Sequence, residues 1–156
     1  MREILFRGKR LSDGEWVTGY YIQPTYHWHK RGIHKDWIAC GAVSNGGWLN
    51  LLQKYAVIHE TVGQFTGLTD KNGKKIFEGD ILEYTSYTGT GIKEVFRAIV
   101  FWDEHRWSYK VIYNNRWTAQ LNNKGYTCDI YKAVAANFSE VIGNIHDNPE
   151  LLTKEE

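Results

Sequence analysis

The chain has 156 residues, of which 42% are hydrophobic and 24% charged, as in an ordinary soluble globular protein with one core or two small lobes. Its net charge of +1 excludes a strong overall attraction to nucleic acid. Aromatic residues reach 15%, which favours strands over helices. Because no apolar run suits a signal peptide or a membrane span, we expect a cytoplasmic protein without a membrane role.

The two cysteines, Cys40 and Cys128, lie far apart in the sequence and form no paired spacing. A metal site or a disulfide framework uses cysteines at closer and more regular intervals. We therefore expect two reduced thiols of a cytosolic protein rather than a disulfide.

The first elements form an N-terminal hairpin. Ile4 and Phe6 alternate with polar neighbours, Ser12-Asp13-Gly14 supplies a turn, and the run from Trp16 to Ile22 is typical of a returning strand. Pro24 then interrupts the pattern, and the residues from Thr25 to Lys35 have no helical or strand period, which indicates a loop.

That loop is rich in basic, aromatic and histidine residues, and the stretch 26–37 is the best candidate for a functional surface. Its cations could meet phosphates while its aromatic rings stack on bases. The candidate residues for such a ligand or nucleic-acid surface are Tyr26, Trp28, Lys30, Arg31 and Lys35. A zinc site could instead begin with His27, His29 and either His34 or Asp36, but the spacing matches no known zinc pattern. We expect no bound metal.

Two shorter elements follow the loop. The segment from Trp37 to Val43 predicts a short strand, and the glycine-rich residues after it predict a turn. The segment from Trp48 to Val57 predicts another strand, although its apolar spacing is also compatible with a helical turn.

The centre of the chain carries the clearest structural signal. Asn72-Gly73 can adopt the positive backbone angles of a tight hairpin, and Asp70 can cap its own backbone there. Glu78-Gly79-Asp80 forms a second polar corner before the apolar strand Ile81–Tyr84. This pattern is typical of the corners of a small barrel, which we expect over Phe65 to Tyr84.

Three features of the second half could be mistaken for chemical sites. The glycines between Tyr87 and Lys93 lack the helix that a phosphate-binding loop requires, so they predict a hairpin connection. The acidic and basic residues from Asp103 to Arg106 are adjacent on a turn, so they would diverge into water rather than converge on a substrate. No nucleophile motif is present either.

The remaining strands are aromatic. The run from Val95 to Trp102 is apolar on both faces, as in a central strand, and an alternating strand follows it. Aromatic side chains there could line a groove, but packing in a small β core explains them better. They are Trp102, Trp107, Tyr109, Tyr113 and Trp117.

The C-terminal segments are short. The stretch from Asp129 to Asn137 leaves a helix and a strand in competition. Asn148, Pro149 and Glu150 suit the start of a helical turn, and residues 153–156 are expected to form a frayed tail.

Three sets of residues carry a resemblance to the YopX family, which occurs mainly in phages and prophages. The chain resembles it at the start, Met1 to Arg7, at the centre, Gln64 to Lys74 and Ile76 to Ile81, and at the end, Val141 to Ile145 and Asn148 to Leu152. The resemblance implies a mostly β fold with an SH3-like barrel portion and implies no catalytic residues. We expect residues 1–152 to form one such domain, or two joined β lobes with a boundary near 58–64.

These observations favour a non-catalytic binding or assembly module with no cofactor, acting in the cytoplasm of a bacterial host. An unidentified protein is the favoured partner, with nucleic acid as the alternative and a metal-dependent enzyme as a third hypothesis. Sheet edges and abundant aromatic residues also favour self-association, without fixing the number of subunits.

Overall fold

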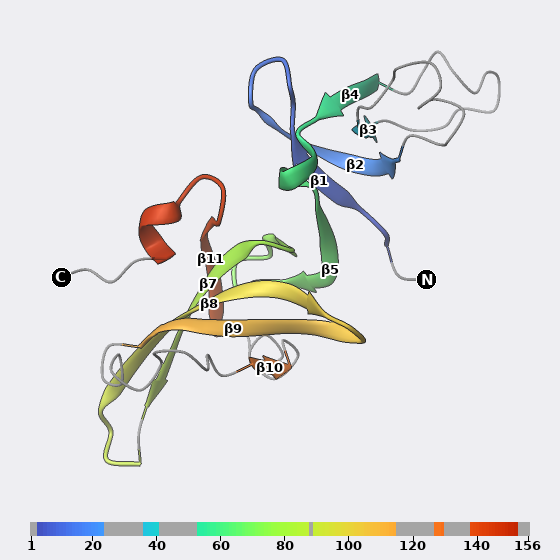
Figure 1. Ribbon diagram of the computed structural model, residues 1–156. Coiled ribbons are helices and arrows are strands. Elements are labelled where there is room, and N and C mark those ends of the chain that lie inside the picture. Colours follow the sequence, from blue (N-terminus) through green and yellow to red (C-terminus); the bar gives the residue numbers. More distant parts are fainter. Residues whose placement is uncertain are drawn as a thin grey trace. The chain divides into compact units, whose positions relative to one another are not determined.

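The computed structural model describes residues 3–23, 36–40, 53–87, 89–114, 127–129 and 138–152. These residues form antiparallel strands and two short 3-10 turns, η1 at His59–Thr61 and η2 at Pro149–Leu152, so the prediction of a mainly β fold is confirmed (Figure 1). The chain divides into two compact units, residues 1–65 and 66–156. The division falls inside strand β5 (Gly63–Thr69).

The N-terminal unit is built on an antiparallel meander. Its strands are hydrogen-bonded in the order β4-β3-β2-β1-β5. They are β1 (Phe6–Lys9), β2 (Trp16–Ile22), β3 (Asp36–Cys40), β4 (Gln53–Val57) and the first residues of β5. The N-terminal hairpin is therefore confirmed, and the described part of the 48–57 segment is a strand rather than a helical turn.

This meander curls until its first and fourth strands meet. Arg10, just beyond β1, forms a bridge with Val57 of β4, and the backbone N–H of Ile58 donates to the carbonyl of Lys9. Gly8 permits the curl, because a Cβ there would lie 3.2 Å from both Ile38 and Val57. The unit thus encloses a small core, in which Ile38 and Val57 are fully or almost fully buried.

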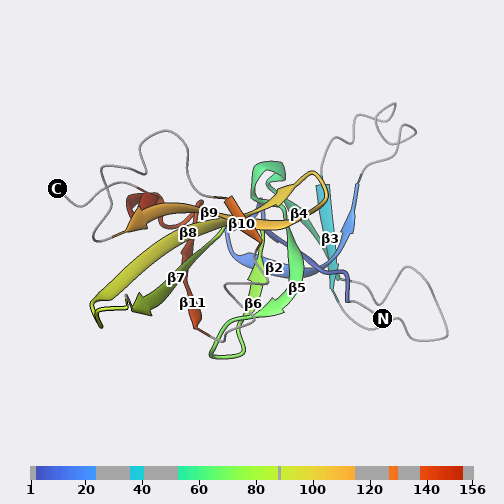
Figure 2. The same ribbon diagram turned by 90° about the horizontal axis from the view of Figure 1, so that it is seen from below.

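The C-terminal unit contains a five-stranded antiparallel sheet in the order β10-β9-β8-β7-β11. Figures 1 and 2 show β7, β8 and β9 side by side. The strands of this sheet are β7 (Asp80–Tyr87), β8 (Lys93–Asp103), β9 (Arg106–Asn114), β10 (Thr127–Asp129) and β11 (Ser139–Asn144). The short strand β6 (Lys75–Phe77) belongs to the same unit but pairs with β5. The sheet has two edges, β10 and β11, so its described strands do not close into a barrel.

The core of this unit lies on one face of the sheet. Its buried residues are Ile76, Leu82, Ala98, Val100, Trp107, Tyr109, Val111 and Val141. The sequence predicts that β8 is buried on both faces. This prediction is wrong at the C-terminal end of the strand, where Trp102 is 45% exposed. Trp107 and Tyr109 are core residues, which confirms for these two the prediction that the aromatic side chains pack in the β core.

The central turn forms as predicted and has a further role. Gly73 has a φ of +79°, and Asp70 Oδ1 accepts hydrogen bonds from the N–H groups of Asn72 and Lys74, at 2.8 and 2.9 Å. Asp70 Oδ2 accepts a third from Val141 N–H on β11, at 3.0 Å. One buried carboxylate therefore joins the turn to a strand about seventy residues later in the chain.

These contacts determine the charge state of Asp70. Burial acts to raise its pKa, but the three backbone N–H groups and the nearby Lys74 charge outweigh burial, so the pKa is lowered from the usual value of 3.8. The carboxylate is therefore ionised at neutral pH. The role of this ionised acceptor is structural, because its two carboxylate oxygens accept hydrogen bonds from three backbone N–H groups.

The C-terminal turn differs from its predicted capping pattern. Asn148 was expected to cap η2, but its Oδ1 accepts the N–H of Asn144 at 3.3 Å, and its backbone carbonyl accepts the N–H of Leu151. The side-chain oxygen of Asn148 therefore binds the end of β11, whereas its side-chain N–H and its backbone carbonyl bind Glu150 and Leu151 of η2. Within the described ranges, no helix is both long and apolar enough to cross a bilayer.

Candidate functional site

The predicted ligand surface lies outside the described residues. Tyr26, Trp28, Lys30, Arg31 and Lys35, together with His27, His29 and His34, belong to the segment that connects β2 to β3. That segment begins and ends at paired residues, since Ile22 of β2 is opposite Trp37 of β3. Other candidate sites lie on the strands of the N-terminal unit, for which the sequence predicts a hairpin but no site.

A cationic and aromatic surface lies on the outer face of the N-terminal meander. Side chains alternate between the faces of a strand, and residues directly opposite each other share a face. Lys9 is opposite Trp16 and Arg7 is opposite Thr18, whereas Gly8 between them points into the core. Arg7 and Lys9 therefore lie on the outer face of β1, beside Trp16 and Thr18 of β2.

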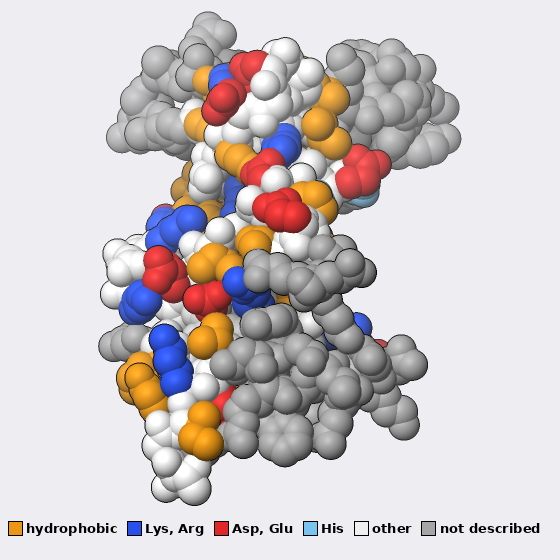
Figure 3. Space-filling model, turned by 90° about the vertical axis from the view of Figure 1, so that its left-hand side faces the viewer, with side chains coloured by type: hydrophobic (Ala, Val, Ile, Leu, Met, Phe, Trp, Pro, Cys, Tyr) orange, Lys and Arg blue, Asp and Glu red, His pale blue; other side chains and the backbone are white. Residues whose placement is uncertain are grey.

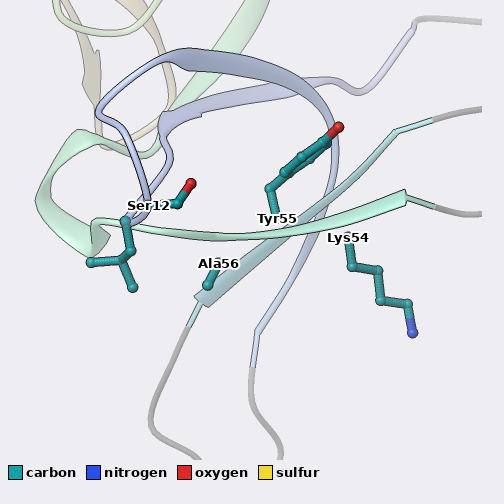
Figure 4. A pocket seen from close by; sticks show the side chains of 5 residues that line it. Ser12, Lys54, Tyr55 and Ala56 are labelled. Atoms are coloured by element: carbon teal, nitrogen blue, oxygen red, sulfur yellow. The ribbon is translucent and has the colours of Figure 1, made fainter.

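The same register adds two more residues to this face. Tyr20 of β2 is opposite Ala39 of β3, and Ala39 is opposite Lys54 of β4. Figure 4 shows Lys54 and Tyr55 on opposite sides of β4, as this alternation requires. We refer to the set as the outer face of the N-terminal unit, which consists of Arg7, Lys9, Trp16, Thr18, Tyr20 and Lys54.

Contacts within the outer face hold its cations against an aromatic ring. The Arg7 guanidinium carbon lies 4.7 Å from the centre of the Trp16 ring, and Lys9 Nζ lies 5.6 Å from it. Such cation–π contacts favour a fixed position of the cation over the ring. Tyr20 is 57% exposed, so the face offers a solvent-exposed aromatic ring beside positioned positive charges.

The charge of the chain is divided unevenly between the two units. Residues 1–65 contain eight Lys and Arg against five Asp and Glu, for a net charge of +3, whereas residues 66–156 contain eleven against thirteen, for −2. On the face of the molecule drawn in Figure 3, side chains of both charges are interspersed over the described surface. Any attraction for an anion is therefore local, and the N-terminal unit is the more suitable of the two.

A second cluster, on the inner side of the meander, consists of Tyr21, Asp36 and His59. The Tyr21 hydroxyl donates to Asp36 Oδ1 at 2.8 Å, and His59 Nδ1 lies 2.5 Å from Asp36 Oδ2. Asp36 is 8% exposed, whereas the His59 side chain is 71% exposed. Nδ1 is the ring nitrogen that contacts Asp36, and Nε2 does not contact it.

This arrangement resembles the way carboxylates orient catalytic or metal-binding histidines. However, no group of three or more potential metal ligands occurs among the described residues. The nearby Thr61 hydroxyl is engaged as a donor to the Ile58 carbonyl and as an acceptor for Lys9 N–H. Both Asp36 oxygens are also engaged, one by Tyr21 and one by His59. We interpret the cluster as a link between β2, β3 and η1.

The cluster leads to a prediction about alkaline pH. Burial and then the Asp36 carboxylate raise the pKa of Tyr21 to about 12 from 10.0. The unfolded chain loses this proton first, so the stabilisation is complete below about pH 10 and is lost as the pH rises towards 12. In Tyr21→Phe, which keeps the ring that contacts Phe6, we expect stability to fall less over this interval. Urea unfolding between pH 9 and 12 measures the difference, and equal slopes would contradict it.

A groove at the end of the meander is the third candidate site. It has a volume of about 420 Å³ and is lined by Leu11, Ser12, Lys54, Tyr55 and Ala56 (Figure 4). The Arg10 guanidinium lies 5.1 Å from the centre of the Tyr55 ring and pairs with Asp13 at 3.0 Å. Ser12, Lys54 and Tyr55 carry the polar groups of the lining. Lys54 and Tyr55 lie on opposite sides of β4 (Figure 4), so these groups do not converge on one point as a catalytic acid–base pair does.

Two other sequence features are structural. The Asp103–Arg106 residues form the tight turn between β8 and β9, where the side chains of Glu104 and His105 are 84% and 87% exposed, as expected for residues that diverge into water. The glycines near residue 90 belong to the connection between β7 and β8, which confirms the predicted hairpin.

Comparisons with known proteins agree with this fold. The model of the YopX protein family matches residues 5–153. The solved structures similar to this chain include the crystal structure of protein EF1440 from Enterococcus faecalis, at 22% identity and a TM-score of 0.50, covering 98% of this chain and 100% of that chain. No curated protein matches significantly. Since the family model covers nearly the whole sequence, the chain belongs to the YopX family.

Proposed function

We propose that this protein is a non-catalytic binding module whose N-terminal unit binds an acidic partner through its outer face. The observation that carries the proposal is the placement of Arg7 and Lys9 over Trp16. Lys54 on β4 adds a third positive charge to the same face. The excess of positive charge in residues 1–65 supports the choice of partner.

We also propose a cellular location for this binding. The resemblance of the sequence to the YopX family favours a phage or prophage protein that acts in the cytoplasm of a bacterial host. A binding role is supported by the arrangement of the titratable groups, because Lys54 and Tyr55 of the groove lie on opposite sides of β4 and the contacts of the Asp36–His59 pair link β2, β3 and η1.

Binding of a simple polyanion tests this proposal. Heparin serves as the probe, and titration calorimetry at increasing salt concentrations measures its affinity. We expect weak binding that decreases with salt, because cations on the protein displace counterions from the polyanion. The triple variant Arg7→Gln, Lys9→Gln, Lys54→Gln should bind at least about tenfold more weakly, as expected from the loss of three charge contacts.

The matched control removes the same number and type of charges from the C-terminal unit. Lys93, Arg106 and Lys110 are exposed, and their replacement by glutamine should leave heparin affinity near that of the wild type. An equal loss in both triple variants would show that only net charge matters and would contradict a specific surface. Circular dichroism confirms that each variant is folded.

A further inference from the structure

The outer face of the N-terminal unit also combines positive charge with accessible stacking surface. Trp16 and Tyr20 lie four residues apart on β2, on the same face, which corresponds to about 13 Å along a strand. Arg7 and Lys9 border them on β1, and Lys54 lies two strands away on the other side. The cations of β1 therefore lie at the Trp16 end of β2, and Lys54 lies level with Tyr20.

Each part of this arrangement suits a different part of a nucleotide. Exposed aromatic rings and arginine guanidinium planes stack on unpaired bases, whereas lysine and arginine contact the phosphates. The Trp16 ring already holds the Arg7 guanidinium at 4.7 Å, which presents a flat cation to an incoming base. Tyr20, with 57% of its surface exposed, provides a second position for stacking.

The spacing favours a single strand over a duplex. In a duplex the bases are stacked about 3.4 Å apart and paired, so their faces are not accessible to side chains on a sheet. Rings about 13 Å apart can instead contact two bases of an extended strand, with room for further bases between them. An acidic protein would use the cations of this face but would have no need of an exposed ring such as Tyr20.

We infer that the outer face of the N-terminal unit binds single-stranded nucleic acid, with bases stacking at Tyr20 and at the Arg7–Trp16 pair and phosphates meeting Lys9 and Lys54. This inference rests on the proposed function, since it names the class of acidic partner. It uses residues of the described strands and is independent of the predicted loop surface at residues 26–37.

The test compares three probes on the full chain. Fluorescence anisotropy measures binding of a short labelled oligothymidine, and the corresponding duplex and inorganic polyphosphate serve as competitors. We expect the single strand to bind more tightly than either competitor at equal phosphate concentration. Tyr20→Ser should weaken oligothymidine binding at least about fivefold, the lower limit for loss of one base stack, without changing the competition by polyphosphate.

Two variants separate stacking from general effects. Tyr20→Phe keeps the ring and should bind like the wild type, whereas Tyr87→Ser removes a 67% exposed aromatic ring from the C-terminal unit and should also bind like the wild type. The double variant Lys9→Gln, Lys54→Gln should reduce the slope of log affinity against log salt by about 1.4, or about 0.7 for each lost phosphate contact.

The outcomes distinguish the inference from the proposed function. If polyphosphate and duplex compete as well as the single strand, or if Tyr20→Ser has no effect, the inference is overturned while binding of an acidic partner stands. If neither heparin, polyphosphate nor oligothymidine binds the wild-type chain, the proposed function is overturned and the inference with it.

Discussion

Replacement of Asp70 by alanine is expected to destabilise the protein by about 3 kcal/mol or more, because it removes a buried acceptor of three backbone hydrogen bonds. Two of the donors hold the central turn, and the third, Val141 N–H, belongs to β11. Their N–H groups would remain poorly solvated after the substitution, which adds a desolvation cost to the lost bonds. Urea unfolding followed by circular dichroism measures the change.

The pH dependence gives a second readout of the same substitution. The native pKa of Asp70 is lowered from 3.8, so the unfolded chain takes up the proton first and the stabilisation is lost as pH falls below about 4. The difference between the wild type and Asp70→Ala should therefore be largest near neutral pH and shrink in acid. A difference that stays constant down to pH 2 would contradict the ionised acceptor.

An adjacent ion pair supplies the control for Asp70. Glu140 of β11 pairs with Lys71 of the same turn at 2.5 Å, but both side chains are more than 40% exposed. Solvent-exposed pairs contribute little, so Glu140→Gln should unfold close to the wild-type midpoint. A comparable loss in both variants would attribute the effect to general charge around the turn rather than to the buried carboxylate.

Replacement of Gly19 by alanine is expected to disrupt the N-terminal unit, with a cost of about 3 kcal/mol or more for overpacking against backbone. A Cβ at this position would collide with the carbonyl oxygen of Ala39 and would lie 2.8 Å from its carbonyl carbon and 3.1 Å from Ile38 Cγ2. Relief requires β3 to move away from β2, because the obstacle is main chain rather than a flexible side chain. Thermal unfolding measures the loss.

Two comparisons make the Gly19 prediction specific. Gly89→Ala meets no atom within 4 Å and has no positive φ, so it should leave the midpoint unchanged. Separation of β2 from β3 also breaks the Tyr21–Asp36 hydrogen bond, so Gly19→Ala should move the pKa of Tyr21 back towards 10, as read by ultraviolet titration of the phenolate. A stable variant with an unchanged tyrosine titration would contradict the close approach.

The sequence predicted the local features that depend on a few neighbouring residues. The Asp70–Gly73 turn, the N-terminal hairpin and the β7–β8 hairpin connection follow from turn chemistry and from alternation of polar and apolar residues. Such signals act over short distances, where backbone preference decides the conformation. The hydrogen bonds that Asp70 accepts within its own turn are local in this sense, whereas the bond that it accepts from Val141 N–H is not.

The candidate site was less accessible to sequence reasoning. The outer face depends on a register across four strands, and Lys54 joins it through two successive pairings. Alternation within the predicted hairpin could have indicated Arg7, Lys9 and Trp16 as neighbours. Local density of charged and aromatic residues pointed instead to the 26–37 loop, because density is visible in a sequence whereas register is not.

The sequence by itself therefore determined a mainly β chain of the YopX family, its tight turns and its first hairpin, since these depend on residue type and short-range geometry. Only the tertiary structure decided which distant groups meet. It placed Tyr21, Asp36 and His59 together, brought Gly19 against the Ala39 backbone, and set cations from β1 and β4 around the aromatic residues of β2. The physical reason is that strand pairing fixes these neighbours through long-range register, which no local pattern specifies.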